Sequence, residues 1–168
     1  MRNQSKTMAL CGVTAALAVV IMCMGGLIPV ATYVCPMFGA LLLRMILPVV
    51  GTRMAWVWYA VVSVLSALLG PDKEAAAVFV FLGYYPIIQP KLSRRKLSWL
   101  WKELYFNASV LIMYAVLMHL LGMEKIAEEF SELGTFMSAI LLVLGNVTFW
   151  LLDRLLTLGI RRKGKRRG

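Results

Sequence analysis

The chain has 168 residues, of which 61% are hydrophobic and only 15% are charged, and its formal net charge is +10. A water-soluble domain of this composition would expose large apolar patches, so the composition excludes an ordinary soluble protein and predicts an integral membrane protein. One crossing of the hydrocarbon core takes about 20 apolar residues, so several crossings in one bundle use nearly all of the chain.

The first apolar segment follows the charged start MRNQSK, which resembles the beginning of a signal peptide. Small residues are not paired near residues 24–34 at the spacing that a signal peptidase needs, so we expect a retained first helix. Cys11, Cys23 and Cys35 lack the spacing of a metal site or a redox motif, and no small residue precedes them as in a lipoprotein site. We expect them to be small packing residues.

Six apolar segments are candidates for membrane spans, which predicts an all-α, polytopic membrane protein with a single transmembrane bundle. The expected spans are residues 8–26, 36–50, 54–70, 75–89, 104–121 and 135–158, and a basic tail follows at 159–168. The second span is the least regular, because Pro29, Pro36 and Pro48 interrupt helical hydrogen bonding and residues 27–43 are equally apolar. We expect a broken or partly looped segment there.

Four groups of Lys and Arg residues outside the spans fall on one side of the membrane if there are six spans. They occur before the first span, at Arg53, in residues 91–102 and in the tail, whereas four glutamates collect in residues 122–134. Since cytoplasmic loops are enriched in Lys and Arg, we predict a multi-pass protein of the bacterial cytoplasmic membrane with both termini cytoplasmic. The basic residues then attract anionic lipid, by about 1 kcal/mol each near the surface, and we expect no nucleic-acid partner.

Two segments are predicted to lie at the membrane surface. Residues 93–106, SRRKLSWLWKELYF, alternate basic and aromatic side chains, which favours an interfacial helix before the fifth span. Residues 123–133 place Ile126, Phe130 and Leu133 on one helical face, which favours a short cap over the outer end.

Catalytic chemistry has little support in the sequence. His119 is the only histidine, and the Gly-x-Ser-x-Gly, His-Glu-x-x-His and phosphate-loop patterns do not occur. We therefore predict no enzyme activity, no catalytic residue, no metal site and no cofactor. A self-powered transporter is also disfavoured, because the acidic residues lie at span ends rather than at mid-depth and no internal repeat is evident.

A binding subunit fits better, because it needs only a cavity lined by polar helix ends and irregular backbone. The segment GPDKE breaks the apolar sequence at the outer side, and its aspartate is placed to cap the next helix. The segment GYYP favours a kink in the fourth span. The candidate solute contacts are Asp72, Lys73, Glu74, Tyr84, Tyr85, His119 and Asn146.

Each of these candidates has a simpler interpretation. The three charges of GPDKE suit an ordinary loop, Tyr84 suits packing, and His119 suits a polar position at the interface. The amide of Asn146 suits a hydrogen bond to another helix, worth about 0.6 kcal/mol on average in membranes.

Arg44 lies within or at the inner end of the second span. A charge in the membrane needs a partner or a route to the surface. We predict a structural ion pair between Arg44 and Asp153, which is expected at the inner level of the sixth span.

The chain also resembles a known family. It combines six short helices with both ends inside, a basic tail, and a first helix rich in small residues, KTMALCGVTAALAVV at 6–20. Together these features resemble the substrate-binding S component of energy-coupling factor (ECF) transporters. The segments LLGPDKEAAAVFVFLGYYP and FNASV are similar to a family of small uncharacterised bacterial membrane proteins.

The resemblance implies a subunit that binds a small solute, such as a vitamin, under the outer loops. It also implies partners, namely the T component and the ATPase subunits of an energy-coupling module. The T component would contact Gly12 and Ala16, where the family often shows Ala-x-x-x-Ala, although this spacing also serves ordinary helix packing. The alternative is an accessory or scaffold membrane protein that binds a protein partner and no solute.

Overall fold

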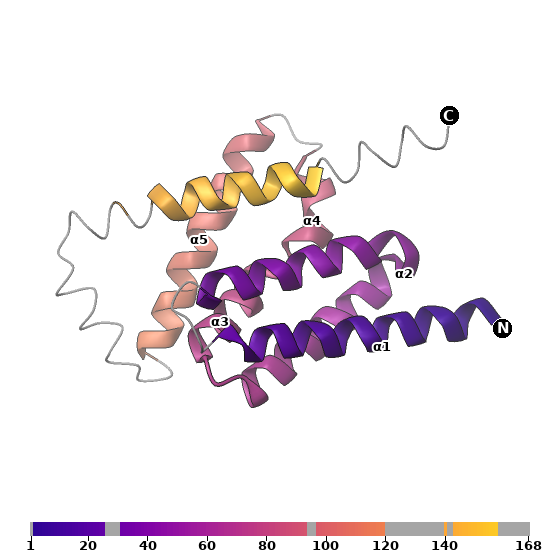
Figure 1. The fold of residues 1–168 in the computed structure, drawn as a ribbon. Helices are drawn as coiled ribbons and strands as arrows, with labels where there is room; N and C mark the ends of the chain where they lie inside the picture. Colours follow the sequence, from indigo (N-terminus) through magenta and orange to yellow (C-terminus); the bar gives the residue numbers. More distant parts are fainter. Residues whose placement is uncertain (1, 26–30, 94–96, 120–139, 141–142, 158–168) are drawn as a thin grey trace. The chain divides into compact units, whose positions relative to one another are not determined.

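The computed structural model describes residues 2–25, 31–93, 97–119, 140 and 143–157. Its elements within these ranges are helices: α1 (Arg2–Cys23), α2 (Ala31–Leu69), α3 (Lys73–Leu82), α4 (Tyr85–Leu92), α5 (Ser98–His119) and a helix at residues 143–157 (Figure 1). The chain divides into two compact units, Met1–Ser98 and Trp99–Gly168. The prediction of an all-α protein is confirmed for the described residues.

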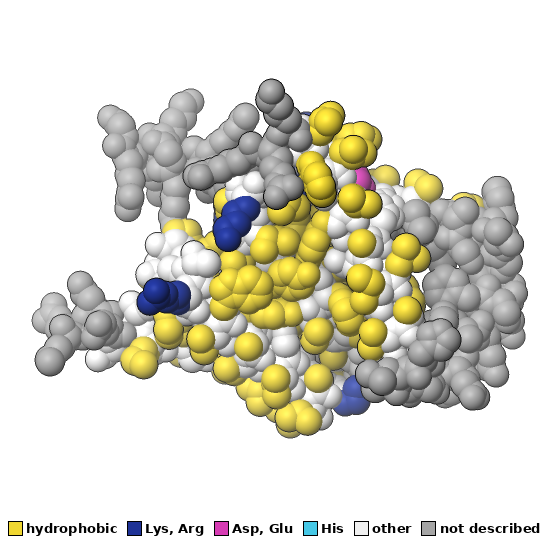
Figure 2. All heavy atoms as spheres, turned by 180° about the vertical axis from the view of Figure 1, so that it is seen from behind, with side chains coloured by type: hydrophobic (Ala, Val, Ile, Leu, Met, Phe, Trp, Pro, Cys, Tyr) yellow, Lys and Arg dark blue, Asp and Glu magenta, His cyan; other side chains and the backbone are white. Residues whose placement is uncertain are grey.

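Three helical stretches of the described residues are long and apolar enough to cross a membrane: Ser5–Cys23, Ala31–Leu69 and Lys73–Leu92. Many large apolar side chains of these stretches are exposed, including Met8 and Val13 on α1. Figure 2 shows hydrophobic side chains over much of the described surface on one face, with few charges among them. Exposed apolar surface of this extent is suited to contact with lipid.

Helix α2 reverses its direction at Gly51, whose φ of 77° and ψ of 168° are not helical. Side chains on both sides of this reversal meet Phe79 of α3. A Cβ atom at Gly39 would lie 2.7 Å from Phe79 Cε2, and the ring centroids of Tyr59 and Phe79 are 5.8 Å apart. In a straight helix residues 39 and 59 would be about 30 Å apart, so α2 is a helical hairpin with halves at 31–50 and 52–69 (Figure 1).

The start of α2 differs from the prediction for the second span. The helix begins at Ala31, before the expected start at residue 36, and both Pro36 and Pro48 lie inside it. Each proline removes one backbone hydrogen bond, yet the helix continues through both. The expected break is therefore not found over residues 31–50, and the preceding residues 26–30 lie outside the described part of the chain.

The core of the first unit lies where α1, both halves of α2, α3 and α4 meet. Phe79 is fully buried there, and the ring fits because Gly39 faces it from α2 and Gly83 follows it along its own chain. The buried apolar side chains that form this core are Ala18, Val19, Met22, Cys35, Leu43, Ile46, Ala55, Trp58, Val62, Ala75, Phe79 and Ile87. Membrane helices associate through such close packing because lipid is as apolar as their side chains.

The predicted kink in the fourth span is a break between two helices. Helix α3 ends at Leu82, and α4 begins at Tyr85 with a proline in its first turn. Proline suits that position because its missing N–H is not needed there. The sequence GYYP therefore interrupts the helix as expected.

In the second unit α5 is one helix of 22 residues, Ser98–His119. The prediction of a separate interfacial helix over residues 93–106 is wrong for residues 98–106, which belong to α5. Basic and aromatic side chains indicate proximity to the membrane surface, but they do not determine whether a helix bends there. The predicted cap at 123–133 and the basic tail at 159–168 lie outside the described residues.

Replacing Gly51 with alanine is expected to destabilise the first unit by about 1–3 kcal/mol, because its φ and ψ lie in a region that only glycine adopts readily. The measurement is thermal unfolding in a mild detergent, followed by circular dichroism. The matched control is Gly12→Ala, since a Cβ atom there meets nothing within 4 Å. Equal melting temperatures for the two variants would contradict a reversal that depends on Gly51.

Candidate functional site

The segment singled out in the sequence lies beside the start of α2. Two hydrogen bonds connect this segment to the first turn of α2, Thr32 with Asp72 and Tyr33 with Glu74. We call these four residues and the intervening Lys73 the helix-end cluster. The cluster joins the first turn of α2 to the start of α3, although about 40 residues separate the two segments in sequence.

Asp72 makes two hydrogen bonds with its two carboxylate oxygens. Oδ1 accepts from the backbone N–H of Ala75 at 3.0 Å, so Asp72 is the N-cap of α3, as predicted. Oδ2 accepts from the hydroxyl of Thr32 at 2.6 Å. A Cβ atom at Gly25 would lie 3.8 Å from the same Oδ2, so the end of α1 also approaches this carboxylate closely.

Lys73 and Glu74 bond to opposite ends of α2. The ammonium group of Lys73 donates to the carbonyl oxygens of Ala67 at 2.8 Å and Gly70 at 3.0 Å, at the end of α2. These are carbonyls that a helix C-terminus leaves without helical partners. The hydroxyl of Tyr33 donates to Glu74 Oε1 at 2.9 Å, and this bond is exposed.

Thr32 and Tyr33 were not among the predicted site residues. Their one sequence signal is that two hydroxyl side chains occur together in an otherwise apolar outer segment, at the same expected depth as GPDKE. Recognising them as partners of Asp72 and Glu74 requires the relative rotation of α2 and α3. The cluster therefore presents hydroxyl and carboxylate groups at one end of the first unit. The Tyr33–Glu74 pair is its exposed part.

Tyr84 and Tyr85 have different environments. Tyr84 belongs to a group of rings with Trp56, Tyr59 and Phe79: it stacks on Trp56 with a centroid distance of 5.8 Å and lies edge-on to Tyr59 at 5.6 Å. The hydroxyl of Tyr59 donates to the carbonyl oxygen of Val80. Tyr85 is buried. The packing interpretation of Tyr84 is thus supported.

Asn146 lies in the second unit, where α5 and the helix at 143–157 form an antiparallel pair. Its amide makes two reciprocal hydrogen bonds with Asn107, at 3.0 and 3.2 Å. The rings of Phe106 and Phe149 stack beside them, with centroids 4.6 Å apart. The interpretation of Asn146 as a helix-to-helix contact is therefore supported. The signal in the sequence is that an amide side chain occurs in each of the two apolar segments.

Asp153 forms an ion pair with Lys102 of α5, with Nζ and Oδ2 2.8 Å apart. The two side chains are largely buried, so they satisfy each other in a setting where an isolated charge is costly. The predicted partner, Arg44, belongs to the other unit, and the Arg44–Asp153 pair stays a prediction. The side chain of His119, at the end of α5, lies outside the described residues.

One groove lies along the face of this helix pair. It is shallow and open, has a volume of about 440 Å³, and is called here the α5 groove. Its lining residues are Trp99, Glu103, Val143, Asn146, Val147 and Trp150. Glu103 lies just before the expected fifth span. Burial raises the pKa of Glu103, and the negative charge of Asp153 raises it further.

Gly12 and Ala16 lie on the exposed side of α1. The opposite side of the helix packs on α2, where the indole N–H of Trp58 donates to the hydroxyl of Thr14 at 3.1 Å. A Cβ atom at Gly12 would meet nothing within 4 Å. Within the described residues of the first unit, the Gly-x-x-x-Ala spacing therefore serves no contact between helices.

No protein-family model matches the chain, and no curated protein or solved structure gives a match. The resemblance to S components of ECF transporters therefore stays a prediction.

Replacing Asp72 with alanine is expected to destabilise the first unit by about 1–3 kcal/mol, because α3 loses its cap and Thr32 loses its acceptor. Thr32→Val removes only the second bond and is expected to cost about 1 kcal/mol. Thermal unfolding in detergent measures both variants and their combination. The double variant should be no less stable than Asp72→Ala by more than about 0.5 kcal/mol.

The matched control is Thr148→Val, because the hydroxyl of Thr148 donates only to the carbonyl of Leu144 in its own helix. Its melting temperature should stay close to that of the wild type. Strict additivity of Asp72→Ala and Thr32→Val would contradict a direct bond between these residues.

Proposed function

We propose that this chain is a six-span substrate-binding subunit of the bacterial cytoplasmic membrane. It captures a small solute from outside and delivers it with a separate energy-coupling module composed of a T component and ATPase subunits. The solute binds at the helix-end cluster.

The observation that carries this proposal is the pair of cross-links between distant segments, Thr32 with Asp72 and Tyr33 with Glu74. They bring the first turn of α2 and the start of α3 together at one end of the first unit. In the family that the sequence resembles, solutes bind under the loops that lead into these same two segments. The exposed Tyr33–Glu74 pair supplies a phenol and a carboxylate, which suit a solute with hydrogen-bond donors.

The partner surface has a separate support. Gly12 and Ala16 lie on the exposed side of α1, where a small residue lets another helix approach closely. Large apolar residues, among them Val13 and Leu17, flank this strip and are also exposed. A helix of the T component packed there would cover all four.

Six spans are supported by the hairpin form of α2. Each half, at 31–50 and 52–69, is close to the length of about 20 residues that one crossing needs. With α1 and with α3 and α4 together, the first unit then provides four crossings, and the second unit provides two. The turn at Gly51 lies inside the cell, and the turn at Gly70 lies outside.

Single cysteines test this topology in a variant whose three native cysteines are replaced with alanine. Pro71 and Thr52 are both exposed, at opposite ends of the second half of α2. We expect Pro71→Cys to react with a membrane-impermeant maleimide on intact cells, and Thr52→Cys to react only after permeabilisation. Labelling of both positions from the same side would contradict two crossings by α2.

A scaffold function is the second candidate, and one observation favours it. Asp72 caps α3 and Lys73 bonds the end of α2, so both charges already have structural partners. In that case the helix-end cluster only fixes the turn, and the bundle binds a protein partner without a solute.

Purification in a mild detergent, followed by mass spectrometry of bound proteins and small molecules, separates the two functions. We expect ATPase subunits and a solute to copurify with the wild type. Glu74→Gln should retain the ATPase subunits and lose at least about tenfold in solute, because one charge-assisted hydrogen bond is lost. Gly12→Leu should retain the solute and lose the ATPase subunits.

Val13→Leu is the matched control for Gly12→Leu, since Val13 is already large and exposed. It should retain both solute and partners. A different protein partner together with an empty bundle would contradict the transport function and support the scaffold.

A further inference from the structure

The α5 groove brings together residues of opposite character at one end of the second unit. Trp99 and Glu103 come from the first turns of α5, and Trp150 comes from the facing helix. The two indoles are 64% and 44% exposed, so their rings are accessible to a ligand. The groove continues along Val143 and Val147, toward the apolar end of the helix pair.

The charged end of the groove suits a cation. Among the described residues, no side chain forms an ion pair or hydrogen bond with the carboxylate of Glu103, whereas neighbouring Asp153 is neutralised by Lys102. Burial and the charge of Asp153 disfavour the ionised form of Glu103. A bound cation would relieve both effects, and indole faces attract ammonium groups.

A positive group lies next to this site. The guanidinium carbon of Arg154 is 5.2 Å from the centroid of the Trp150 ring. Arginine binds phosphate through several N–H donors. Glu103 lines the groove together with Trp150, and Arg154 lies over the Trp150 ring. This combination of opposite charges matches a head group that carries an ammonium and a phosphate.

The position along the helices identifies the kind of ligand. Tryptophan and charged residues are typical of the membrane–water interface, and Lys102, Glu103, Asp153 and Arg154 mark that level here. Val143 and Val147 lie further along the helix, where the predicted sixth span would face lipid tails. The order of cation site, phosphate site and apolar strip is the order of the parts of a phospholipid.

We propose that the α5 groove binds one aminophospholipid, with its ammonium at Glu103 between Trp99 and Trp150, its phosphate at Arg154, and its acyl chains along Val143 and Val147. This lipid is zwitterionic and has no net charge. The groove therefore prefers it over anionic lipids, although the net charge of +10 attracts anionic lipids to the chain in general. The proposal rests on the helix pair alone and does not depend on the solute-binding function.

Native mass spectrometry of the delipidated full-length protein in a mild detergent tests the proposal. The probes are phosphatidylethanolamine and phosphatidylglycerol with identical acyl chains. We expect the wild type to bind one phosphatidylethanolamine more tightly than phosphatidylglycerol. Glu103→Gln should weaken phosphatidylethanolamine binding about tenfold and leave phosphatidylglycerol binding unchanged.

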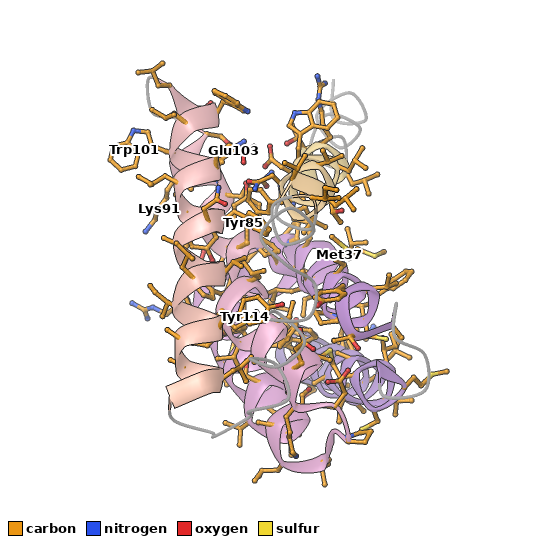
Figure 3. All side chains as sticks on the ribbon, turned by 90° about the vertical axis from the view of Figure 1, so that its left-hand side faces the viewer. Met37, Tyr85, Lys91, Trp101, Glu103 and Tyr114 are labelled. Atoms are coloured by element: carbon orange, nitrogen blue, oxygen red, sulfur yellow. The ribbon has the colours of Figure 1, made fainter. Side chains whose placement is uncertain are left out.

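Trp150→Leu and Trp101→Leu form a matched pair, because both tryptophans are 44% exposed. Figure 3 shows Trp101 and Glu103 on opposite sides of α5. Trp150→Leu should weaken phosphatidylethanolamine binding about three- to tenfold, and Trp101→Leu should not change it. If Glu103→Gln alters the melting temperature, the tryptophan pair supplies the same test.

Three results would overturn the proposal. Phosphatidylglycerol could bind the wild type as tightly as phosphatidylethanolamine, which would show general charge attraction. Trp101→Leu could weaken binding as much as Trp150→Leu. Glycerophosphoethanolamine could bind as tightly as the lipid, which would show a site for a soluble ammonium compound.

Discussion

The first unit depends on the reversal of α2 at Gly51. Because the chain turns there, residues 39 and 59 reach the same phenylalanine, and α3 packs against both halves of the hairpin. The same reversal lets Trp58 reach Thr14 on α1. A single backbone position with positive φ thus places three helices around one core, and the helix-end cluster follows from that placement.

Local features of the fold could be predicted from the sequence. The apolar segments, the cap at Asp72 and the break at GYYP are each decided by a few neighbouring residues. The start of α2 could not be predicted in this way, because prolines tolerated within a helix look the same in sequence as prolines that end one. Likewise, the Trp- and Lys-rich start of α5 indicates depth in the membrane and gives no information on bending.

The partner of a side chain could be predicted only where few residues of matching chemistry were available. Asn107 and Asn146 are two amides in apolar segments, so their pairing follows from having few alternatives. Asp153 had several basic residues at its expected depth, and it pairs with Lys102 of the antiparallel neighbour. To choose among several basic residues at the same depth, one must know how each helix is rotated about its axis. Hydrophobic periodicity defines this rotation poorly in a segment that is apolar all round.

The structural bonds of the helix-end cluster are compatible with solute binding. An ionised carboxylate accepts about four hydrogen bonds and an ammonium donates three, so Asp72 and Lys73, with two each, retain capacity. Their bonds fix the turn, and a fixed turn holds its neighbours in place for a ligand. Glu74 and Tyr33 differ because their bond is exposed and ends no helix. Under the proposed function, a solute would displace the bond between Tyr33 and Glu74 without loss of a helix cap, while the bonds of Thr32, Asp72 and Lys73 keep the turn in place.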